Sequence, residues 1–175
     1  MGLYIGIDLG TSAAKLLLVN EQGGIVNAVT KAYPISFPQP GWAEQNPTDW
    51  WSACLIGLEE LLDGQDKKSV AGIGLGGQMH GLVTLDEDDG IIRDAILWND
   101  GRTAEETDWL NTEIGRERLS ALTGNIAFAG FTAPKLNVQW SMVNGYRNPS
   151  SIFASSLIIS LSHSGSKTRS EGAHV

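Results

Sequence analysis

The first 32 residues contain three short apolar segments, joined by connections that leave room only for tight turns. The segments are Leu3–Asp8, Lys15–Asn20 and Ile25–Ala32, and each has the length of a strand rather than of a helix. Glycine lies in both connections, at Gly10 and at Gly23-Gly24, and this spacing predicts two consecutive antiparallel hairpins. Because the first three segments of the chain form a sheet, the later segments are expected to extend that sheet or to cover it.

Residues 46–64 carry the signals of a helix. Asn46 suits the N-cap, Pro47 the first helical position and Asp49 the first turn, while Gly64 is a plausible stop. Apolar side chains then recur at three- and four-residue spacing, which predicts that one face of the helix is apolar: Trp51, Leu55, Leu58 and Leu62.

The second half of the chain alternates between strand and helix signals. Apolar runs predict strands at Val70–Gly76, Leu82–Asp86 and Ala95–Trp98. A capping box at Thr103–Glu106 predicts a helix through about residue 111, and a shorter helix is predicted over Arg116–Leu122, ended by the glycine two residues later. This order indicates an α/β domain with a mixed sheet and flanking helices rather than a strict βαβ repeat.

Acidic residues outnumber basic ones, 20 to 12, and the net charge is −8. This balance argues against nucleic acid and acidic membrane surfaces as partners, because both attract basic proteins. Cys54 is the one cysteine, which excludes an internal disulfide and a multi-cysteine metal cluster. The sequence lacks an apolar run of about 18 residues and opens on a strand signal, so we expect a cytoplasmic protein without a membrane span.

The composition changes sharply after Leu136. Residues 1–136 hold 9 basic and 19 acidic residues, whereas residues 137–175 hold 3 basic and 1 acidic. Serine rises from 5 in the first segment to 10 in the much shorter second one. We therefore predict an acidic folded part over 1–136 and an atypical serine-rich tail over 137–175.

A polar loop, Asp8-Leu9-Gly10-Thr11-Ser12, joins the first two predicted strands. Gly10 permits a tight turn close to a ligand, and consecutive amides beside the hydroxyls of Thr11 and Ser12 can form an anion-binding concavity. Asp8, at the end of a buried strand, is suited to hold a metal ion or its bound water near that anion. The alternative is an ordinary hairpin turn, and the residue types alone leave both interpretations open.

The other glycine-rich patterns in the sequence do not indicate a nucleotide-binding site. No G-x-x-x-x-G-K-[ST] loop occurs in the sequence. Gly72–Gly77 matches G-x-G-x-x-G, but that motif has to close a strand and open a helix, and here a polar break and another predicted strand follow. We reject a dinucleotide site and assign these glycines to close backbone approach within a strand.

Two polar segments follow predicted strands, where ligands commonly bind. In the first, His80 can donate a hydrogen bond to a hydroxyl group, and Met79 can pack against an irregular apolar surface. In the second, three adjacent side chains offer donors and acceptors suited to a polyol: Asn99, Asp100 and Arg102. The alternatives are a structural histidine with a core methionine, and a turn followed by a solvated arginine.

These motifs, in this order, resemble those of a known family. The Asp8–Ser12 loop is similar to the first phosphate loop of the actin-like ATPases, and the Gly41–Pro47 segment followed by Trp50-Trp51 resembles the signature of the FGGY carbohydrate kinases. The remaining motifs resemble the xylulokinase branch of that family: Gly77–Gly81, Ile96–Arg102, Thr123–Asn125 and Phe131–Leu136. The resemblance covers residues 1–136.

The resemblance implies an incomplete ribonuclease-H-like domain of the actin-like ATPase type, which is an α/β fold. It implies ATP-dependent phosphorylation of D-xylulose to D-xylulose 5-phosphate, with ATP and Mg²⁺ as cofactors and a small-molecule sugar as partner. Asp8 would be a catalytic residue and metal ligand, and Gly10, Thr11 and Ser12 would contact the ATP phosphates. The residues expected to bind the sugar are Met79, His80, Asn99, Asp100 and Arg102.

The resemblance also implies parts that this sequence does not contain. The family's general base is an aspartate late in the first domain, and no aspartate follows Asp108 here. Because the tail does not continue the family pattern, we expect a truncated or frameshifted chain with little or no turnover. The alternatives are an inactive remnant that binds sugar weakly, a kinase for another sugar or polyol, and a different actin-like ATPase. Missing strands would leave a sheet edge exposed, through which the chain could associate with itself.

Overall fold

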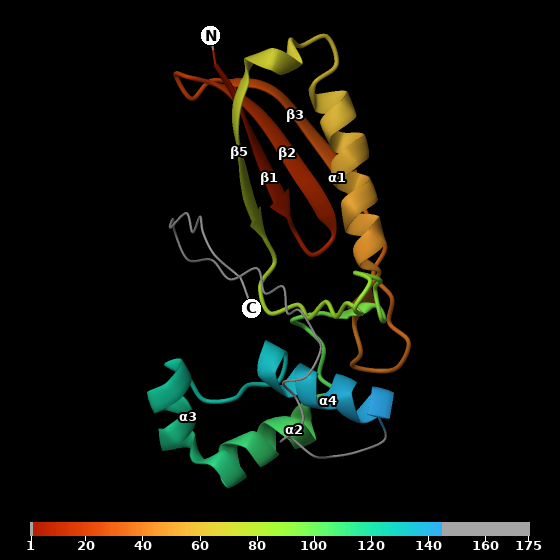
Figure 1. Ribbon diagram of the computed structural model, residues 1–175, viewed down its shortest axis with the longest axis vertical. Helices are drawn as coiled ribbons and strands as arrows, with labels where there is room; N and C mark the ends of the chain where they lie inside the picture. Colours follow the sequence, from red (N-terminus) through yellow and green to blue (C-terminus); the bar gives the residue numbers. More distant parts are fainter. Residues whose placement is uncertain (1, 145–175) are drawn as a thin grey trace.

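The computed structural model describes residues 2–144, with side chains through residue 139. Its main sheet has four strands in the order β3-β2-β1-β5, and Figure 1 shows this sheet at one end of the molecule, with three helices gathered at the other. The strands are β1 (Leu3–Leu9), β2 (Ala13–Asn20), β3 (Ile25–Ala32) and β5 (Val70–Gly77). The fold is therefore of the expected α/β class.

The two predicted hairpins are confirmed. β1 pairs antiparallel with β2 from Leu3↔Asn20 to Leu9↔Ala14, and β2 pairs antiparallel with β3. In the second turn the side-chain oxygen of Asn20 accepts hydrogen bonds from the backbone of Gln22 and Gly24, so the side chain satisfies turn amides that face solvent. β5 then pairs parallel with β1, which makes the sheet mixed, as expected.

Helix α1 (Pro47–Leu61) begins where the sequence predicts, and the side chain of Asn46 caps it by accepting from Thr48 N. The apolar face of the helix is only partly buried, because the side chains of Trp51 and Leu55 are 66% and 44% exposed. Leu58 and Leu62 do pack against the core as partly buried side chains. The fully buried positions of α1 are Ala53, Cys54, Gly57 and Leu61.

Small residues explain why α1 does not turn the centre of its apolar face to the sheet. A Cβ atom at Gly57 would lie 2.6 Å from Leu16 Cδ1, so the glycine lets the helix backbone lie directly on β2. Side-chain size, and not hydrophobicity alone, therefore decides which face of α1 is turned to the sheet. Cys54 lies in this core, as predicted, and burial raises the pKa of its thiol.

The middle of the chain contains less strand than the sequence predicts. Only β6 (Ala95–Ile96) forms from the Ala95–Trp98 run, and it pairs with β4 (Glu44–Gln45). The predicted strand at Leu82–Asp86 is wrong, since it contributes only isolated bridges. The cause is the turn that follows, in which the Asp86 carboxylate accepts from the backbone of Asp88 and Gly90 and bends the chain after a few residues.

The C-terminal described part is helical. It consists of α2 (Ala104–Trp109), the π-helical segment η2 (Leu110–Gly115), α3 (Arg116–Thr123) and α4 (Thr132–Asn144), while a short 3₁₀ segment, η1 (Lys67–Ser69), precedes β5. Gly124 ends α3 with a φ of 76°, as predicted. The predicted capping box is wrong, because Thr103 makes no side-chain capping bond to α2 and its Oγ instead accepts from Gly130 N.

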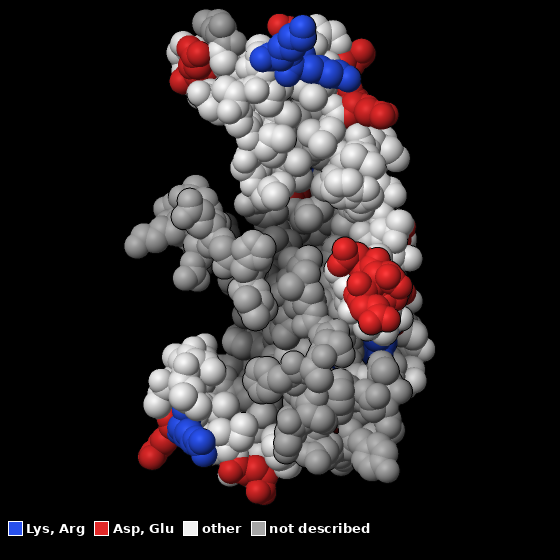
Figure 2. Space-filling view, viewed as in Figure 1, with Lys and Arg blue, Asp and Glu red and all other residues white. Residues whose placement is uncertain are grey.

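Two surface features complete the description. The acidic side chains of the turn at 86–89 are exposed and lie together beside the N-terminal end of α1 (Figure 2). Within residues 2–144, no helix is long and apolar enough to cross a membrane. The predicted boundary at Leu136 falls inside α4, and most of the predicted tail lies outside the described residues.

Candidate functional site

Three segments that are distant in the sequence meet at the loop between β1 and β2. Gln78, directly after β5, donates its backbone N–H to Leu9 O at 2.7 Å. The indole of Trp98 donates to the hydroxyl of Thr11 at 3.0 Å. The structure therefore brings the predicted phosphate loop together with the starts of both predicted sugar-binding segments.

Gln45 connects these segments to one another through its buried side chain. Its Nε2 donates to Thr11 O at 2.8 Å and to Pro34 O at 3.1 Å, while its Oε1 accepts from Trp50 Nε1 and Gln78 Nε2. Because both ends of the amide are used, the loop at Thr11 is fixed to its neighbours. The sequence pattern alone does not single out Gln45, since its partners Thr11 and Gln78 are 34 and 33 residues away along the chain.

The Gln78 side chain leaves one polar atom unused. Among the described residues, Gln78 Oε1 is buried without a hydrogen-bond partner. A buried carbonyl oxygen of this kind normally binds a donor from a ligand or a water molecule. It therefore marks a polar position where a ligand hydroxyl could donate.

Gly10 explains the tightness of the loop. Its N–H donates to Ala13 O at 3.0 Å, and a Cβ at this position would lie 3.1 Å from that same oxygen. The phenol of Tyr33 donates to Gly10 O from the other side. Burial, with smaller contributions from Cys54 and Asp8, raises the pKa of Tyr33 to about 12, so this donor keeps its proton at physiological pH.

Asp8 lies near the end of β1 with its side chain exposed, and Ser12 is exposed in the loop. Within residues 2–144, no group of three or more His, Cys, Asp or Glu side chains is placed to hold a metal. A single carboxylate still fits Mg²⁺, because this ion is commonly bound by one or two carboxylates, waters and substrate phosphates. The donor set at Asp8 is thus compatible with Mg²⁺ brought by a nucleotide.

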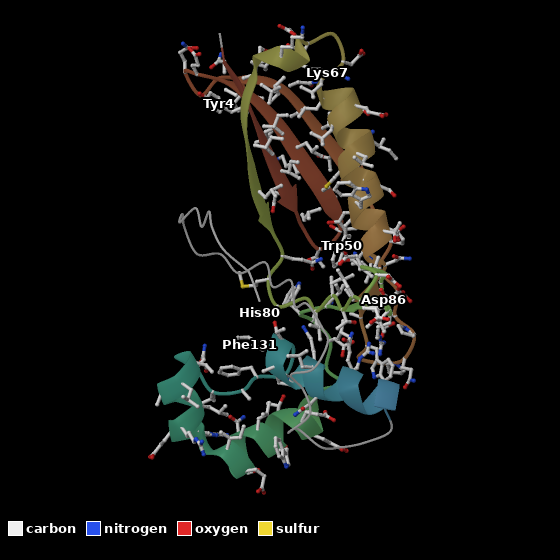
Figure 3. The ribbon with its side chains drawn as sticks, in the orientation of Figure 1. Tyr4, Trp50, Lys67, His80, Asp86 and Phe131 are labelled. Carbon is white, nitrogen blue, oxygen red and sulfur yellow. The ribbon has the colours of Figure 1, made fainter. Side chains whose placement is uncertain are left out.

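His80 has an unusual backbone and a well-defined ring position. Its φ is 63°, in the left-handed region that few residues other than glycine adopt. The imidazole stacks on Phe131 at a centroid distance of 3.9 Å and an interplanar angle of 11°, and Figure 3 labels the two residues next to each other. Burial, with a smaller contribution from Lys135, lowers the pKa of His80, so the ring is neutral at pH 7. Met79 beside it is half exposed.

Lys135 is the functional candidate that the sequence analysis does not single out. Its side chain is completely buried, and its ammonium group donates to the carbonyls of His80 at 2.6 Å and Gly130 at 2.5 Å. Burial lowers its pKa to about 8. The available signal is a lysine in the first turn of a helix, within a motif that is otherwise apolar or small.

Asp100 and Arg102 are buried and paired with each other. Arg102 Nε and Nη2 donate to the Asp100 carboxylate at 2.9 and 2.7 Å, and the backbone of Ala43 and of Arg102 also donates to it. Burial alone would raise the pKa of Asp100, but these hydrogen bonds outweigh it and hold the pKa below its ordinary value. All the acceptor positions of Asp100 are engaged, so the geometry favours a positioning role for it.

The same arginine connects two further residues. Arg102 Nη1 and Arg93 Nη2 each donate to Glu44 Oε1 at 2.5 Å, and the Arg102 guanidinium lies 3.6 Å from the centroid of the Trp42 ring. The hydrogen bonds to Asp100 and Glu44 keep the pKa of Arg102 above its ordinary value despite burial. This network fixes the Trp98–Arg102 loop against β4.

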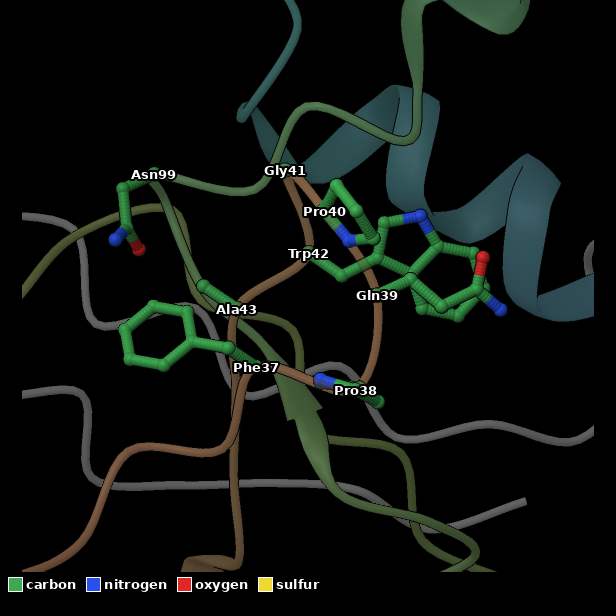
Figure 4. Close-up of a pocket in the computed structure, with 8 residues that line it drawn as sticks. All are labelled: Phe37, Pro38, Gln39, Pro40, Gly41, Trp42, Ala43 and Asn99. Carbon is green, nitrogen blue, oxygen red and sulfur yellow. The ribbon is translucent and has the colours of Figure 1, made fainter.

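The side chain of Asn99 takes no part in the buried network of Asp100 and Arg102. It is exposed and lines a cavity of about 520 Å³ together with residues 37–43 (Figure 4). Aromatic rings beside an amide are a common lining for sugar ligands. Of the predicted sugar-binding residues, Asn99 and Met79 are thus accessible, His80 is half-buried, and Asp100 and Arg102 are enclosed.

Comparison with known proteins agrees with this arrangement. The N-terminal domain of the FGGY family of carbohydrate kinases matches residues 3–147. The xylulose kinase of Escherichia coli K12 is 46% identical over 134 residues, which are 77% of this chain and 27% of that protein. The glycerol kinase of Parabacteroides distasonis is 31% identical over 82% of this chain and 29% of its own length.

A solved structure shows the same fold. The crystal structure of a xyloylose kinase from Brucella ovis superposes with a TM-score of 0.75 at 42% identity, and the match covers 89% of this chain and 32% of that one. The chain thus spans about a third or less of the length of the relatives that it matches. With its phosphate-type loop, its sugar-type segments and this match over most of its length, the chain belongs to the FGGY family of carbohydrate kinases.

Proposed function

We propose that the site described above is the sugar-binding and phosphate-binding part of a xylulokinase, an enzyme that transfers the γ-phosphoryl group of ATP to a hydroxyl of D-xylulose. The observation that carries the proposal is the hydrogen-bonded junction at the Asp8–Ser12 loop, where Gln78 donates to Leu9 O and Trp98 donates to the Thr11 hydroxyl. Phosphoryl transfer depends mainly on positioning and on charge neutralisation, and a fixed junction between two ligand-binding loops supplies the first of these. A cytoplasmic location and a small-molecule sugar partner belong to the same proposal.

Each residue has a role in the proposal. Gly10, Thr11 and Ser12 bind the phosphates through backbone amides and hydroxyl groups, and Asp8 orients Mg²⁺, which would neutralise charge on the phosphates when it is bound. Met79 and His80 contact the sugar. Asn99 is retained as a sugar-facing residue, whereas Asp100 and Arg102 act by holding that loop in place.

A second candidate function is sugar binding without turnover. The chain corresponds to 27% of the length of the Escherichia coli relative, so binding can be tested on it separately from turnover. The 31% identity to a glycerol kinase keeps another sugar or polyol as the alternative substrate. We also retain the proposal that residues 137–175 derive from a frameshift, which sequencing of the coding DNA would test.

Calorimetric titration of the full chain with D-xylulose, glycerol and gluconate tests the proposal. We expect saturable D-xylulose binding that weakens about tenfold in His80→Ala, because a hydrogen bond to the sugar is lost. A folded chain that binds none of the three compounds would contradict the proposal. A coupled ADP-release assay distinguishes the candidates: xylulose-dependent release that disappears in Asp8→Ala shows turnover, and its absence shows binding alone.

A further inference from the structure

Lys135 is a completely buried cation that the proposed chemistry does not use. Its Nζ donates to two backbone carbonyls, His80 O and Gly130 O, and within residues 2–144 it forms no salt bridge with a carboxylate. It also lies in the first turn of α4, where the helix dipole disfavours positive charge. A buried ammonium group at such a position is unfavourable unless its hydrogen bonds replace its hydration.

The two carbonyls belong to segments that have to be held in place. His80 adopts a φ of 63°, which is disfavoured for a residue with a Cβ atom and persists only when its surroundings stabilise it. Gly130 has a φ of 85°, and a Cβ at this position would lie 2.1 Å from Trp98 O. Lys135 therefore connects the His80 segment to a loop that is pressed against the Trp98–Arg102 segment.

Phe131 gives the second half of the arrangement. It directly follows Gly130, and its ring carries the stacked imidazole of His80. Phe128 packs against Phe131 at a centroid distance of 5.1 Å and supports it from behind. Lys135 thus holds the backbone of His80, and Phe131 holds its ring. Phe131 directly follows Gly130, whose carbonyl Lys135 also binds.

We propose that Lys135 is a positioning residue, which fixes the backbone of His80 and thereby sets the imidazole on Phe131 in the orientation used for sugar binding. The sugar-binding part rests on the function proposed above. The charged groups that act on Lys135 are Asp100, which favours its charged form, and Arg102, which opposes it. The charge of Lys135 in turn disfavours protonation of His80.

NMR of the His80 imidazole tests the positioning directly and does not need a substrate. In Lys135→Met, which keeps a long apolar side chain without the charge, we expect the His80 carbon-bound proton signals to lose their ring-current shift from Phe131 and the pKa of His80 to rise. Lys67→Met, an exposed lysine of η1, is the matched control and should leave both unchanged. Unchanged His80 signals in a folded Lys135→Met chain would overturn the proposal.

The wild-type chain provides a second measurement if Lys135→Met fails to fold. Burial and the charge of Lys135 lower the pKa of His80 below its ordinary value, so its own titration is centred below pH 7. A further inflection of the His80 signals near pH 8 is expected, because Lys135 loses its proton at about that pH. A flat response between pH 7 and pH 10 would contradict contact between the two residues.

A double-mutant cycle then links the positioning to the sugar. Lys135→Met should weaken D-xylulose binding about tenfold when His80 is present and change it little in the His80→Gly background, because glycine adopts the left-handed backbone unaided. Equal losses in both backgrounds would show that Lys135 acts on stability only and would overturn the positioning role. If the wild-type chain binds no sugar, the proposed function falls, while the NMR result still decides whether Lys135 positions His80.

Discussion

At the residue scale, the site depends on a few buried polar side chains that satisfy each other. Gln45 uses its whole amide, and Asp100 uses both carboxylate oxygens. Leaving a buried polar group without its partner costs more free energy than the hydrogen bond itself contributes. These residues therefore fix the loops more firmly than an apolar contact of the same size would.

Asp100→Asn should lower the free energy of unfolding by about 3 kcal/mol, because Arg102 would keep its charge but lose one of its two buried carboxylate partners. Urea unfolding measures the change. Asp88→Asn, in the exposed turn at 86–89, is the matched control and should stay within about 0.5 kcal/mol of the wild type. Equal effects of the two substitutions would contradict the buried role of Asp100.

The Asp100 carboxylate should make the free energy of unfolding depend on pH in the acidic range. The pKa of Asp100 is lowered in the folded chain, so its contribution is present above the ordinary value of 3.8 and is lost as pH falls through the lower folded value. Unfolding followed between pH 5 and pH 2 should therefore be less steep with pH in Asp100→Asn than in the wild type. Parallel curves would argue against an ionised Asp100 in the folded state.

At the element scale, α1 shows what a sequence pattern can and cannot predict. The cap at Asn46, the start at Pro47 and both hairpins are local features, and the sequence predicts them correctly. The buried face of α1 depends on how closely Gly57 approaches Leu16, which is a contact between distant residues. Of the two partners of Lys135, Gly130 is only five residues away, but His80 is 55 residues away, so the link between the two segments cannot be inferred from spacing.

Two leucine-to-alanine substitutions on α1 test this orientation. Leu61→Ala removes a completely buried side chain and should cost about 2–5 kcal/mol of unfolding free energy. Leu55→Ala makes the same chemical change on a side chain that is 44% exposed, and it should cost less than about 1 kcal/mol. A larger loss for Leu55→Ala would support the stripe predicted from spacing instead.

At the scale of the whole molecule, the described sheet ends on an apolar edge. β5 is the outer strand next to β1, and the side chains of Ile73 and Leu75 are 60% and 72% exposed. Unpaired edge strands with exposed apolar side chains favour association with other chains. This observation supports the proposal that the chain associates with itself through its sheet edge.

Leu75→Lys should therefore reduce the self-association of the chain, because a charged side chain on an edge strand opposes strand pairing. Sedimentation velocity over a range of concentrations measures the change. Leu122→Lys, on exposed α3, adds the same charge away from the sheet and should have little effect. An unchanged association for Leu75→Lys would place the contact elsewhere on the surface.

The hydrogen bond from Trp98 to Thr11 also sets the polarity of the phosphate-type loop. A threonine hydroxyl carries one proton and two lone pairs, and the indole of Trp98 occupies a lone pair. The hydroxyl proton of Thr11 therefore remains available to a ligand, together with one lone pair. Under the proposed phosphate-binding role, a phosphate oxygen that accepts this proton would extend the chain of hydrogen bonds that begins at the Trp98 indole.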